Sequence, residues 1–243
     1  MPSPHRRDLL LTGAAALLAA AWPASAPAQP KGRRILLVHK ADSASRKTDE
    51  AVKAHLEQRG YAVTLHDQYL PATEACRHDM VALSASVRSR DLMQAYRDVP
   101  VPLLSWENDL LDDLRMTGRR NGADYGQVER EHELWMVNAP HALSAGLAAG
   151  PLNVYNGNAP MGWGKPGLGA SIIATLPGQP DRAAIFCYER GATMDYDFLA
   201  PARRTFFLLD NDTFGNLNAE GLKLFDAAVA WTIADPVGLG CRA

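Results

Sequence analysis

The sequence has little of what marks several protein classes. Its 243 residues include only three cysteines, which are too few for a disulfide scaffold and show no paired spacing for a zinc site. An excess of one charge is also missing, because 25 lysine and arginine residues are balanced by 27 aspartate and glutamate residues. A protein that binds nucleic acid through its phosphates is basic, so nucleic acid is not expected as a partner.

Motifs for metals and phosphates are absent as well. No His-x-His or His-Glu-x-x-His spacing occurs, so the sequence predicts no metal site. The glycine-rich segment 161–169 does not match the phosphate-loop pattern Gly-x-x-x-x-Gly-Lys-Ser/Thr. We interpret it as a loop over a ligand cleft, with Trp163 as a ligand contact, and we expect no cofactor.

The overall composition is that of a globular protein. Hydrophobic residues make up 47% and charged residues 21% of the chain, so folding can bury enough apolar surface to offset the lost chain entropy. The length fits one ordinary domain, or at most two small ones. We expect a single α/β domain over residues 29–243, with an elaboration at about 117–181.

The first 28 residues have the pattern of an export signal. Arg6 and Arg7 precede an apolar stretch from Leu9 to Ala21, and Ala26 to Ala28 offers small residues for cleavage. The apolar stretch has 13 residues, whereas a membrane span needs about 20. The paired arginines favour the twin-arginine pathway, with a general secretory signal as the alternative.

Export of this kind places the mature chain in the periplasm or outside a bacterial cell. The twin-arginine export machinery is then a transient partner. No second long apolar run follows the signal, so we expect a soluble product with no membrane association after cleavage.

Strand and helix patterns alternate along much of the mature chain. Short apolar runs indicate buried strands at 33–39, 61–65, 79–84, 101–106, 183–188 and 204–208. Helical periodicity indicates helices at 45–59 and 91–97, and a last helix that has Asn218 as its N-cap and ends at Asp235. This alternation predicts a parallel sheet with right-handed crossovers. Many Gly, Pro and Asn residues between 117 and 181 indicate antiparallel strands there.

Seven segments of the chain occur in an order that is known from one fold. They are Ile35–Val38, Asp79–Ser86, Pro102–Glu107, Ala139–Leu147, Glu189–Ala192, Pro201–Arg204 and the last helix through Trp231. In this order they resemble the class I glutamine amidotransferase-like fold, closest to its trehalose-utilisation (ThuA-like) branch, with Ala142 where that branch usually has proline. The resemblance covers about residues 33–233. It implies a flavodoxin-like three-layer sandwich with a mainly parallel sheet and an antiparallel elaboration.

The sequence also departs from that family. Amidotransferases of this fold carry a cysteine nucleophile on a Gly-x-Cys-x-Gly turn, and no such segment exists here. Cys187 lies in the apolar run Ile185–Tyr188, where burial raises the pKa of a thiol and makes it unreactive. Glutaminase activity is therefore not expected.

Candidate ligand-binding residues follow the predicted strands, because open α/β sheets bind ligands at the carboxyl ends of their strands. We expect His39, Asp42, Ser84, Trp106, Asn108, His141, Trp163, Arg190 and Asp210 to contact a ligand. Trp106 could stack on a sugar ring or pack in the core.

Two carboxylates, Glu107 and Glu189, stand out at the ends of predicted strands. A glycoside hydrolase needs one carboxyl as acid and another as base or nucleophile, and we expect this pair to face one cleft. The alternative is structural: Glu107 then pairs with Arg190 or another cation and holds the loops.

The two remaining cysteines can meet at the amino-terminal edge of the sheet. Cys76 precedes the third strand, and Cys241 follows the last helix, which runs antiparallel to the strands. A strand order of 2-1-3-4-5 brings both to one edge, and an oxidising compartment allows a bridge. The alternative is a pair of exposed thiols.

Three functions are compatible with these predictions. The first is an exported domain that binds a small polar ligand, a carbohydrate, at the strand ends. The second is a non-catalytic interaction module that keeps the cleft for shape alone. The third is a hydrolase that uses Glu107 and Glu189, so the sequence leaves an enzymatic role open.

Overall fold

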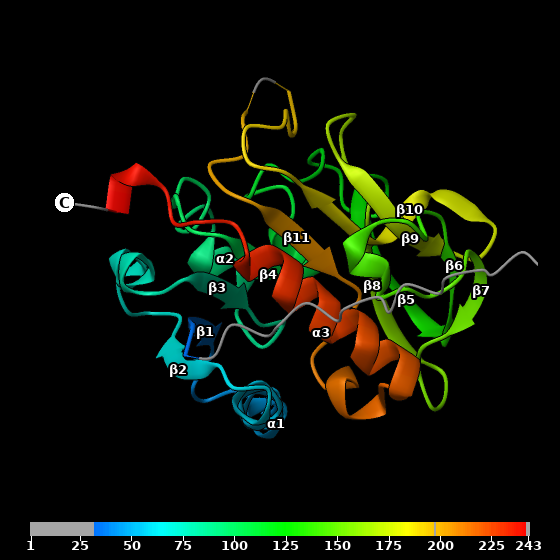
Figure 1. The fold of residues 1–243 in the computed structure, drawn as a ribbon, viewed down its shortest axis with the longest axis horizontal. Helices are drawn as coiled ribbons and strands as arrows, with labels where there is room; N and C mark the ends of the chain where they lie inside the picture. The colour runs from blue at the N-terminus through cyan, green and yellow to red at the C-terminus, as the bar shows by residue number, and fades with distance from the viewer. Residues whose placement is uncertain (1–31, 197, 242–243) are drawn as a thin grey trace, which may run out of the picture.

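The computed structural model describes residues 32–196 and 198–241. The predicted export signal and its cleavage site lie outside these residues. Within them the chain builds one 11-stranded mixed sheet with helices packed on it (Figure 1). None of the described helices is long and apolar enough to cross a membrane.

Five parallel strands form one half of the sheet. They are β1 (Arg34–His39), β2 (Ala62–Asp67), β3 (Met80–Leu83), β4 (Leu103–Ser105) and β11 (Arg204–Phe207). Their order is β2-β1-β3-β4-β11, and every neighbouring pair is parallel. This is the 2-1-3-4-5 order expected from the sequence, because β11 takes the fifth place. The apolar runs of β1, β3, β4 and β11 are buried on both faces, as parallel strands between two layers require, whereas the edge strand β2 is only partly buried.

The other half of the sheet is antiparallel. It contains β5 (Tyr125–Glu131), β6 (Glu133–Met136), β7 (Gly150–Asn153), β8 (Ala159–Gly164), β9 (Ser171–Leu176) and β10 (Gln179–Tyr188). The strands continue from β11 in the order β10-β9-β6-β7, and β5 and β8 branch off beside β10. The antiparallel elaboration is thus larger than expected, because β10, which the sequence suggested as a core parallel strand, runs antiparallel to β11.

Helices cover both faces of the parallel half. On one face lie α1 (Arg46–Gln58) and α3 (Ala219–Ile233), and on the other lies α2 (Ser89–Leu92) with irregular segments. The helix expected at 91–97 is therefore confined to one turn. Short 3₁₀ helices occupy Ala72–Arg77, Asn108–Leu110, Ala142–Ser144, Thr213–Asn216 and Leu239–Cys241.

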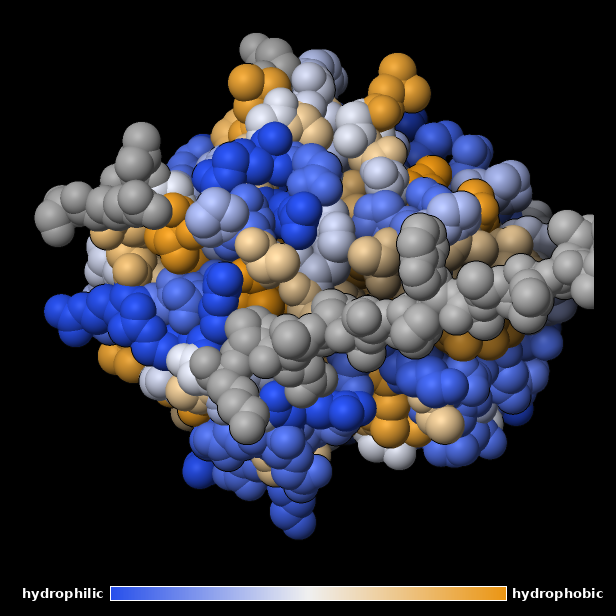
Figure 2. Space-filling model, viewed as in Figure 1, coloured by the Kyte–Doolittle hydropathy of each residue, from blue (hydrophilic) through white to orange (hydrophobic). Residues whose placement is uncertain are grey.

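The long helices show the sequence features that were used to predict them. In α1, Val52 and Leu56 are buried against the sheet, and Figure 2 shows its outer side, at the bottom of the view, as hydrophilic. The Asn218 side chain caps α3 by accepting from the backbone N–H groups of Glu220 and Gly221. Together with the sheet, these layers confirm the α/β sandwich fold class.

The amino-terminal edge of the parallel strands is closed by a covalent and a polar link. Cys76 and Cys241 are joined in a disulfide, with their Cα atoms 5.0 Å apart. Arg204 at the start of β11 is fully buried, and its guanidinium donates to the carbonyl oxygens of Val101 and Val99 at 2.9 and 2.6 Å. The C-terminal segment and the 97–101 loop are thereby fixed to the sheet.

Candidate functional site

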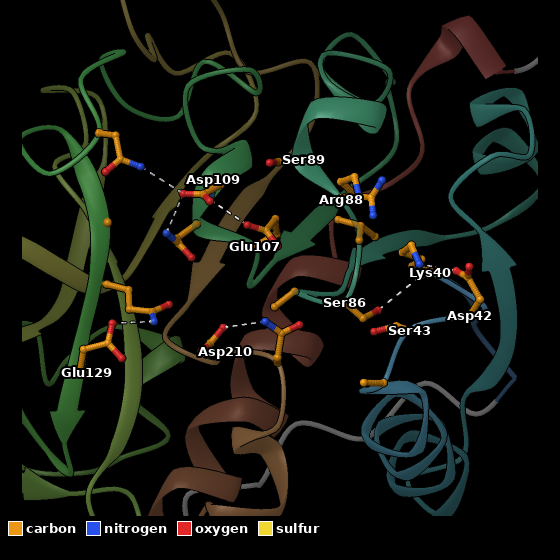
Figure 3. A pocket seen from close by; sticks show the side chains of 18 residues that line it. Lys40, Asp42, Ser43, Ser86, Arg88, Ser89, Glu107, Asp109, Glu129 and Asp210 are labelled. Carbon is orange, nitrogen blue, oxygen red and sulfur yellow. Dashed lines mark hydrogen bonds and ion pairs between the residues drawn. The ribbon is translucent and has the colours of Figure 1, made fainter.

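A cleft of about 670 Å³ opens at the carboxyl edge of the parallel strands (Figure 3). The loops after β1 and β3 contribute Lys40, Ser86 and Arg88 to its lining. The segments after β4 and β11 contribute Glu107 and Asp210. The cleft therefore lies where open α/β sheets bind their ligands.

The antiparallel elaboration supplies a further wall of the cleft. Gln127 and Glu129 of β5 line it, and β5 pairs along its length with β8, which in turn meets β10 at Ala183. Because the elaboration reaches over the carboxyl edge, it adds polar side chains that the parallel strands do not carry.

Glu107 is the most buried acidic side chain in the lining. It lies two residues after the end of β4 and is 7% exposed. Its Oε1 accepts from the backbone N–H of Asp109 at 2.9 Å. Burial raises the pKa of Glu107 to about 8, and the negative charges of Asp109 and Asp210 act in the same direction. The burial of Glu107 therefore favours its protonated form, in which the carboxyl can donate as well as accept a hydrogen bond.

Two aspartates beside Glu107 are also pushed toward the protonated form. Burial raises the pKa of Asp109, and the charges of Asp112 and Asp210 raise it further. Burial likewise raises the pKa of Asp210, and the charge of Glu129 adds to this effect. The carboxyl groups in this half of the cleft thus repel one another.

Amide side chains accompany the two aspartates. Asn108 and Asn121 donate to Asp109 Oδ1 at 3.1 and 3.4 Å. Asn211 donates to Asp210 Oδ1 at 3.2 Å. All five side chains line the cleft, so carboxyl and amide groups alternate around it. Such a lining offers many hydrogen-bond acceptors and donors to a small ligand.

The cationic side chains of the cleft lie on its other side and already have partners. Lys40 forms an ion pair with Asp42, and this pair lowers the pKa of the Asp42 carboxyl. Arg88 lies 3.7 Å from the carboxylate of Asp91. Figure 3 shows Lys40 and Asp42 on the opposite side of Ser86 from Glu107. The cleft is therefore divided into an acidic half and a half with paired charges.

A buried polar cluster supports the cleft from below. Asp49 of α1 is 2% exposed, and its Oδ1 accepts from Ser84 Oγ at 2.5 Å. His39 Nδ1 lies 3.7 Å from the second carboxylate oxygen of Asp49. Ser84 Oγ also accepts from the backbone N–H of Ser86. These bonds fix the loop that carries Ser86 into the lining.

The structure brings four of the predicted site residues together in the cleft. They are Asp42, Glu107, Asn108 and Asp210. His39 and Ser84 belong to the polar cluster beneath it, where they are 5% and 2% exposed.

Two tryptophans that were expected to contact a ligand do not line the cleft. Trp106 is buried and packs edge to face against Phe225 of α3. Trp163 is buried in β8 beneath the guanidinium of Arg182. The segment 161–169 therefore begins as a strand and is not a loop over the cleft, because its alternate residues Met161 and Trp163 fill the core.

Two further predicted site residues, Glu189 and Arg190, lie at the opposite edge of the sheet. Because β10 runs antiparallel to β11, the residues after it lie at the amino edge of the parallel strands. There Glu189 pairs with Arg203, and Arg190 pairs with Asp235. The expectation that Glu107 and Glu189 face one cleft is wrong, and so is the proposed Glu107–Arg190 pair.

His141 is likewise outside the cleft. Its ring contacts Trp231, its Nδ1 accepts from the backbone N–H of Leu143, and its Nε2 lies 3.9 Å from Cys187 Sγ. Cys187 is 1% exposed. Burial raises its pKa to about 12, and the charge of Glu189 adds to this. The interpretation of Cys187 as a core residue is confirmed.

Sequence reasoning missed the residues that β5 contributes. Gln127 and Glu129 alternate with Val128 in the manner of a half-exposed strand. That alternation was available as a signal for the strand. The position of β5 over the carboxyl edge could not be predicted in this way, because it depends on pairing with β8, which lies far away in the sequence.

The acidic residues do not form a compact metal site. Among the residues that the structure describes, no three His, Cys, Asp or Glu side chains are arranged to hold a metal ion. The carboxyl groups are instead distributed around the cleft.

Comparisons with known proteins support the fold. No family model matches the chain, and no curated protein matches its sequence. Among solved structures, the chain is similar to a GMP synthase-like protein from Thermoplasma acidophilum, with a TM-score of 0.53 and 11% identity over 83% of this chain and 94% of the other. It is also similar to a ThuA-like protein from Parabacteroides merdae, with a TM-score of 0.50 and 12% identity over 84% of this chain and 90% of the other. At such identities the similarity concerns the fold, and it agrees with the expected amidotransferase-like and ThuA-like architecture.

Proposed function

We propose that the cleft binds a small polyhydroxylated molecule, a carbohydrate. The main support is the alternation of carboxyl and amide side chains around Glu107 at the carboxyl edge of the sheet. Sugar hydroxyl groups both donate and accept, so they match a lining that contains both kinds of partner. The structural similarity to a ThuA-like protein is in keeping with a role in carbohydrate metabolism.

Binding in this cleft relies on hydrogen bonds rather than ring stacking. The described residues that line the cleft include no aromatic side chain, and the two nearby tryptophans, Trp106 and Trp163, are buried. The carboxyl of Glu107 forms a hydrogen bond with a polar group of the ligand, and the asparagine side chains accept and donate beside it. Without stacking, we expect a polar ligand of modest affinity.

Calorimetric titration with a panel of sugars and polyols tests this proposal. We expect at least one sugar to bind to the wild-type protein, and Asn211→Trp to abolish that binding. Asn211 is exposed and lines the cleft, so an indole at this position fills the ligand space without entering the core. Asp181→Trp is the matched control, because Asp181 is exposed on β10 and outside the cleft lining.

Two outcomes would contradict the proposal. The first is no heat and no thermal stabilisation with any member of the panel, since ligands that bind the folded state raise the melting temperature. The second is binding that Asn211→Trp leaves unchanged, which would place the ligand elsewhere on the protein.

We also propose that the protein is exported through the twin-arginine pathway. The support is the sequence pattern of the first 28 residues, in which Arg6 and Arg7 precede a short apolar stretch. Replacement of both arginines by lysine should keep the precursor in the cytoplasm of the producing bacterium, as measured by cell fractionation. Undiminished appearance of the double variant in the periplasm would indicate the general secretory route.

A further inference from the structure

The acidic half of the cleft lacks a compensating positive charge. Glu107, Asp109, Asp210 and Glu129 line it from three separate elements: the segment after β4, the segment after β11, and β5. Burial and the neighbouring carboxylates raise the pKa values of Glu107, Asp109 and Asp210. No lysine or arginine among the described residues forms an ion pair with any of these four carboxyl groups, and the cleft's Lys40 and Arg88 lie beside other aspartates.

One side chain in this half is buried and incompletely partnered. Glu107 is 7% exposed, and only its Oε1 has a hydrogen-bond partner among the described residues, the backbone N–H of Asp109. Its second oxygen has none there, although the side chain lines the cleft (Figure 3). Because Glu107 lines the cleft, a ligand that donates to this second oxygen would supply the hydrogen bond that the described residues do not.

The nearby cations do not supply it. Lys40 is engaged by Asp42, and Arg88 lies beside Asp91. Both line the cleft, and Figure 3 shows Lys40 on the far side of Ser86 from Glu107. The positive charge that would balance the acidic half must therefore come with the ligand.

The spread of the carboxyl groups favours an organic cation over a metal ion. A divalent cation needs several oxygen ligands converging within about 2.6 Å of one point. The described acidic residues do not converge in this way. An ammonium group on a larger molecule can instead donate its three hydrogens to separate carboxyl oxygens.

We propose that the ligand of the cleft is a polyhydroxylated amine, such as an amino sugar, with its ammonium group in the acidic half beside Glu107 and Asp210. This inference rests on the proposed carbohydrate function and narrows the class of ligand. The hydroxyl groups then lie along the amides of Asn108, Asn121 and Asn211. Binding of the cation should also favour the ionised form of the Glu107 carboxyl, because an opposite charge lowers the pKa of a carboxyl group.

Matched pairs of sugars test the proposal by titration at about pH 7 and low salt. The probes are glucosamine and galactosamine, the neutral sugars glucose and galactose, the N-acetylated amines, and glucose 6-phosphate. We expect an amino sugar to bind about tenfold more tightly than its neutral and N-acetylated counterparts, and this preference should shrink as salt screens the charges. The sugar phosphate should bind most weakly.

Variants assign the preference to the acidic half. Asp210→Asn should reduce the preference for the amine to about threefold or less while keeping binding of the neutral sugar, since it removes a charge but little volume. Glu107→Gln should also reduce the preference for the amine. With two variants, the test still holds if one of them folds poorly. Glu189→Gln is the matched control at the opposite edge and should leave the preference unchanged.

The outcomes separate this inference from the proposed function. Equal affinity for amino and neutral sugars, or tighter binding of the sugar phosphate, would overturn the amine and leave a carbohydrate site. Binding of the hydroxyl-free probe butylamine without binding of any sugar would retain the cation site and overturn the carbohydrate function. No binding of any probe would overturn both.

Discussion

The two edges of the parallel strands differ in the pairing of their charged side chains. At the amino edge, Arg190 meets Asp235 at 2.8 Å and Arg203 meets Glu189 at 2.8 Å. At the carboxyl edge, Glu107 is buried among other carboxyl groups, and no cation pairs with it within the described chain. The same sheet thus carries one edge with matched charges and one with unmatched charges.

This difference separates structural from functional use of charge. Pairing at the amino edge holds the C-terminal segment and the β10–β11 connection to the sheet, where no cleft is needed. The buried carboxyl of Glu107, which no cation pairs with, lowers the stability of the folded state when it is ionised. Proteins commonly retain such unfavourable groups where a ligand uses them. The contrast therefore supports the carboxyl edge as the binding edge.

Removal of the Glu107 charge should give the largest effect, an increase in stability. We expect Glu107→Gln to raise the free energy of unfolding by roughly 4–5 kcal/mol above pH 8, because a pKa raised from 4.5 to about 8 corresponds to about 1.4 kcal/mol for each tenfold change. Glutamine keeps the oxygen that accepts from the backbone N–H of Asp109. Urea denaturation of both proteins at about pH 5, 7 and 9 measures the difference.

The sign of the pH dependence follows from the direction of the shift. Between pH 4.5 and about 8 the folded state keeps a proton on Glu107 that the unfolded state releases. The contribution of Glu107 to the free energy of unfolding of the wild type therefore falls as pH rises through this interval. Glutamine does not titrate, so the advantage of the variant should grow over the same interval and then level off. A constant difference across this range would contradict burial of an unpaired carboxyl.

At the amino edge, substitution of Arg204 should have the opposite sign. Its buried guanidinium donates to the carbonyl oxygens of Arg97, Val99 and Val101. A lysine at this position reaches fewer of them and leaves buried carbonyls unpartnered, so Arg204→Lys should lower the free energy of unfolding by about 4 kcal/mol. Arg34→Lys is the control, because the Arg34 side chain is 58% exposed. If Arg204→Lys and Arg34→Lys were equally stable, the hydrogen bonds of Arg204 would not be what stabilises this edge.

The disulfide should contribute the next largest effect. It links residues 165 positions apart, and loop entropy alone gives an upper value of about 5 kcal/mol. We expect the free energy of unfolding of the double variant Cys76→Ser, Cys241→Ser to be lower by about 3 kcal/mol. This is less than the loop-entropy value, because residual structure in the unfolded chain makes the bridge contribute less than that value. Intact-mass measurement of the exported protein before and after reduction checks the bond itself. A mass that does not rise by about two daltons would exclude the bridge.

The parallel half of the fold could be predicted because its signals are local. The run Ile35–Val38 is apolar on both faces, and the Val52 and Leu56 spacing identifies the following helix. The place of Cys76 and Cys241 also followed, since the direction of each parallel strand is set by its crossover. Asp42, Glu107, Asn108 and Asp210 were found by the same rule, as residues after strands.

The direction of β10 could not be predicted, and the misplacement of Glu189 and Arg190 follows from it. Its apolar run, Ala183–Tyr188, is buried on both faces whether the strand runs parallel or antiparallel. Glu189 and Arg190 were therefore assigned to the carboxyl edge when they lie at the amino edge. Trp163 was misplaced for a different reason, because the glycines in 161–169 suggested a loop, whereas Gly164 allows close approach of Leu111 and Phe186.

Glu189→Gln should have the smallest effect on stability. It compares the two edges directly, because Glu107→Gln is the same change of residue type at the other edge. Glu189 follows β10 as Glu107 follows β4, but its side chain is 58% exposed and paired with Arg203. Exposed ion pairs contribute little, so Glu189→Gln should lower the free energy of unfolding by about 0.2–1 kcal/mol, with no growth between about pH 5 and 9. Urea denaturation alongside Glu107→Gln measures both. If Glu189→Gln also stabilised the protein, and did so increasingly with pH, the difference between the edges would not lie in charge pairing.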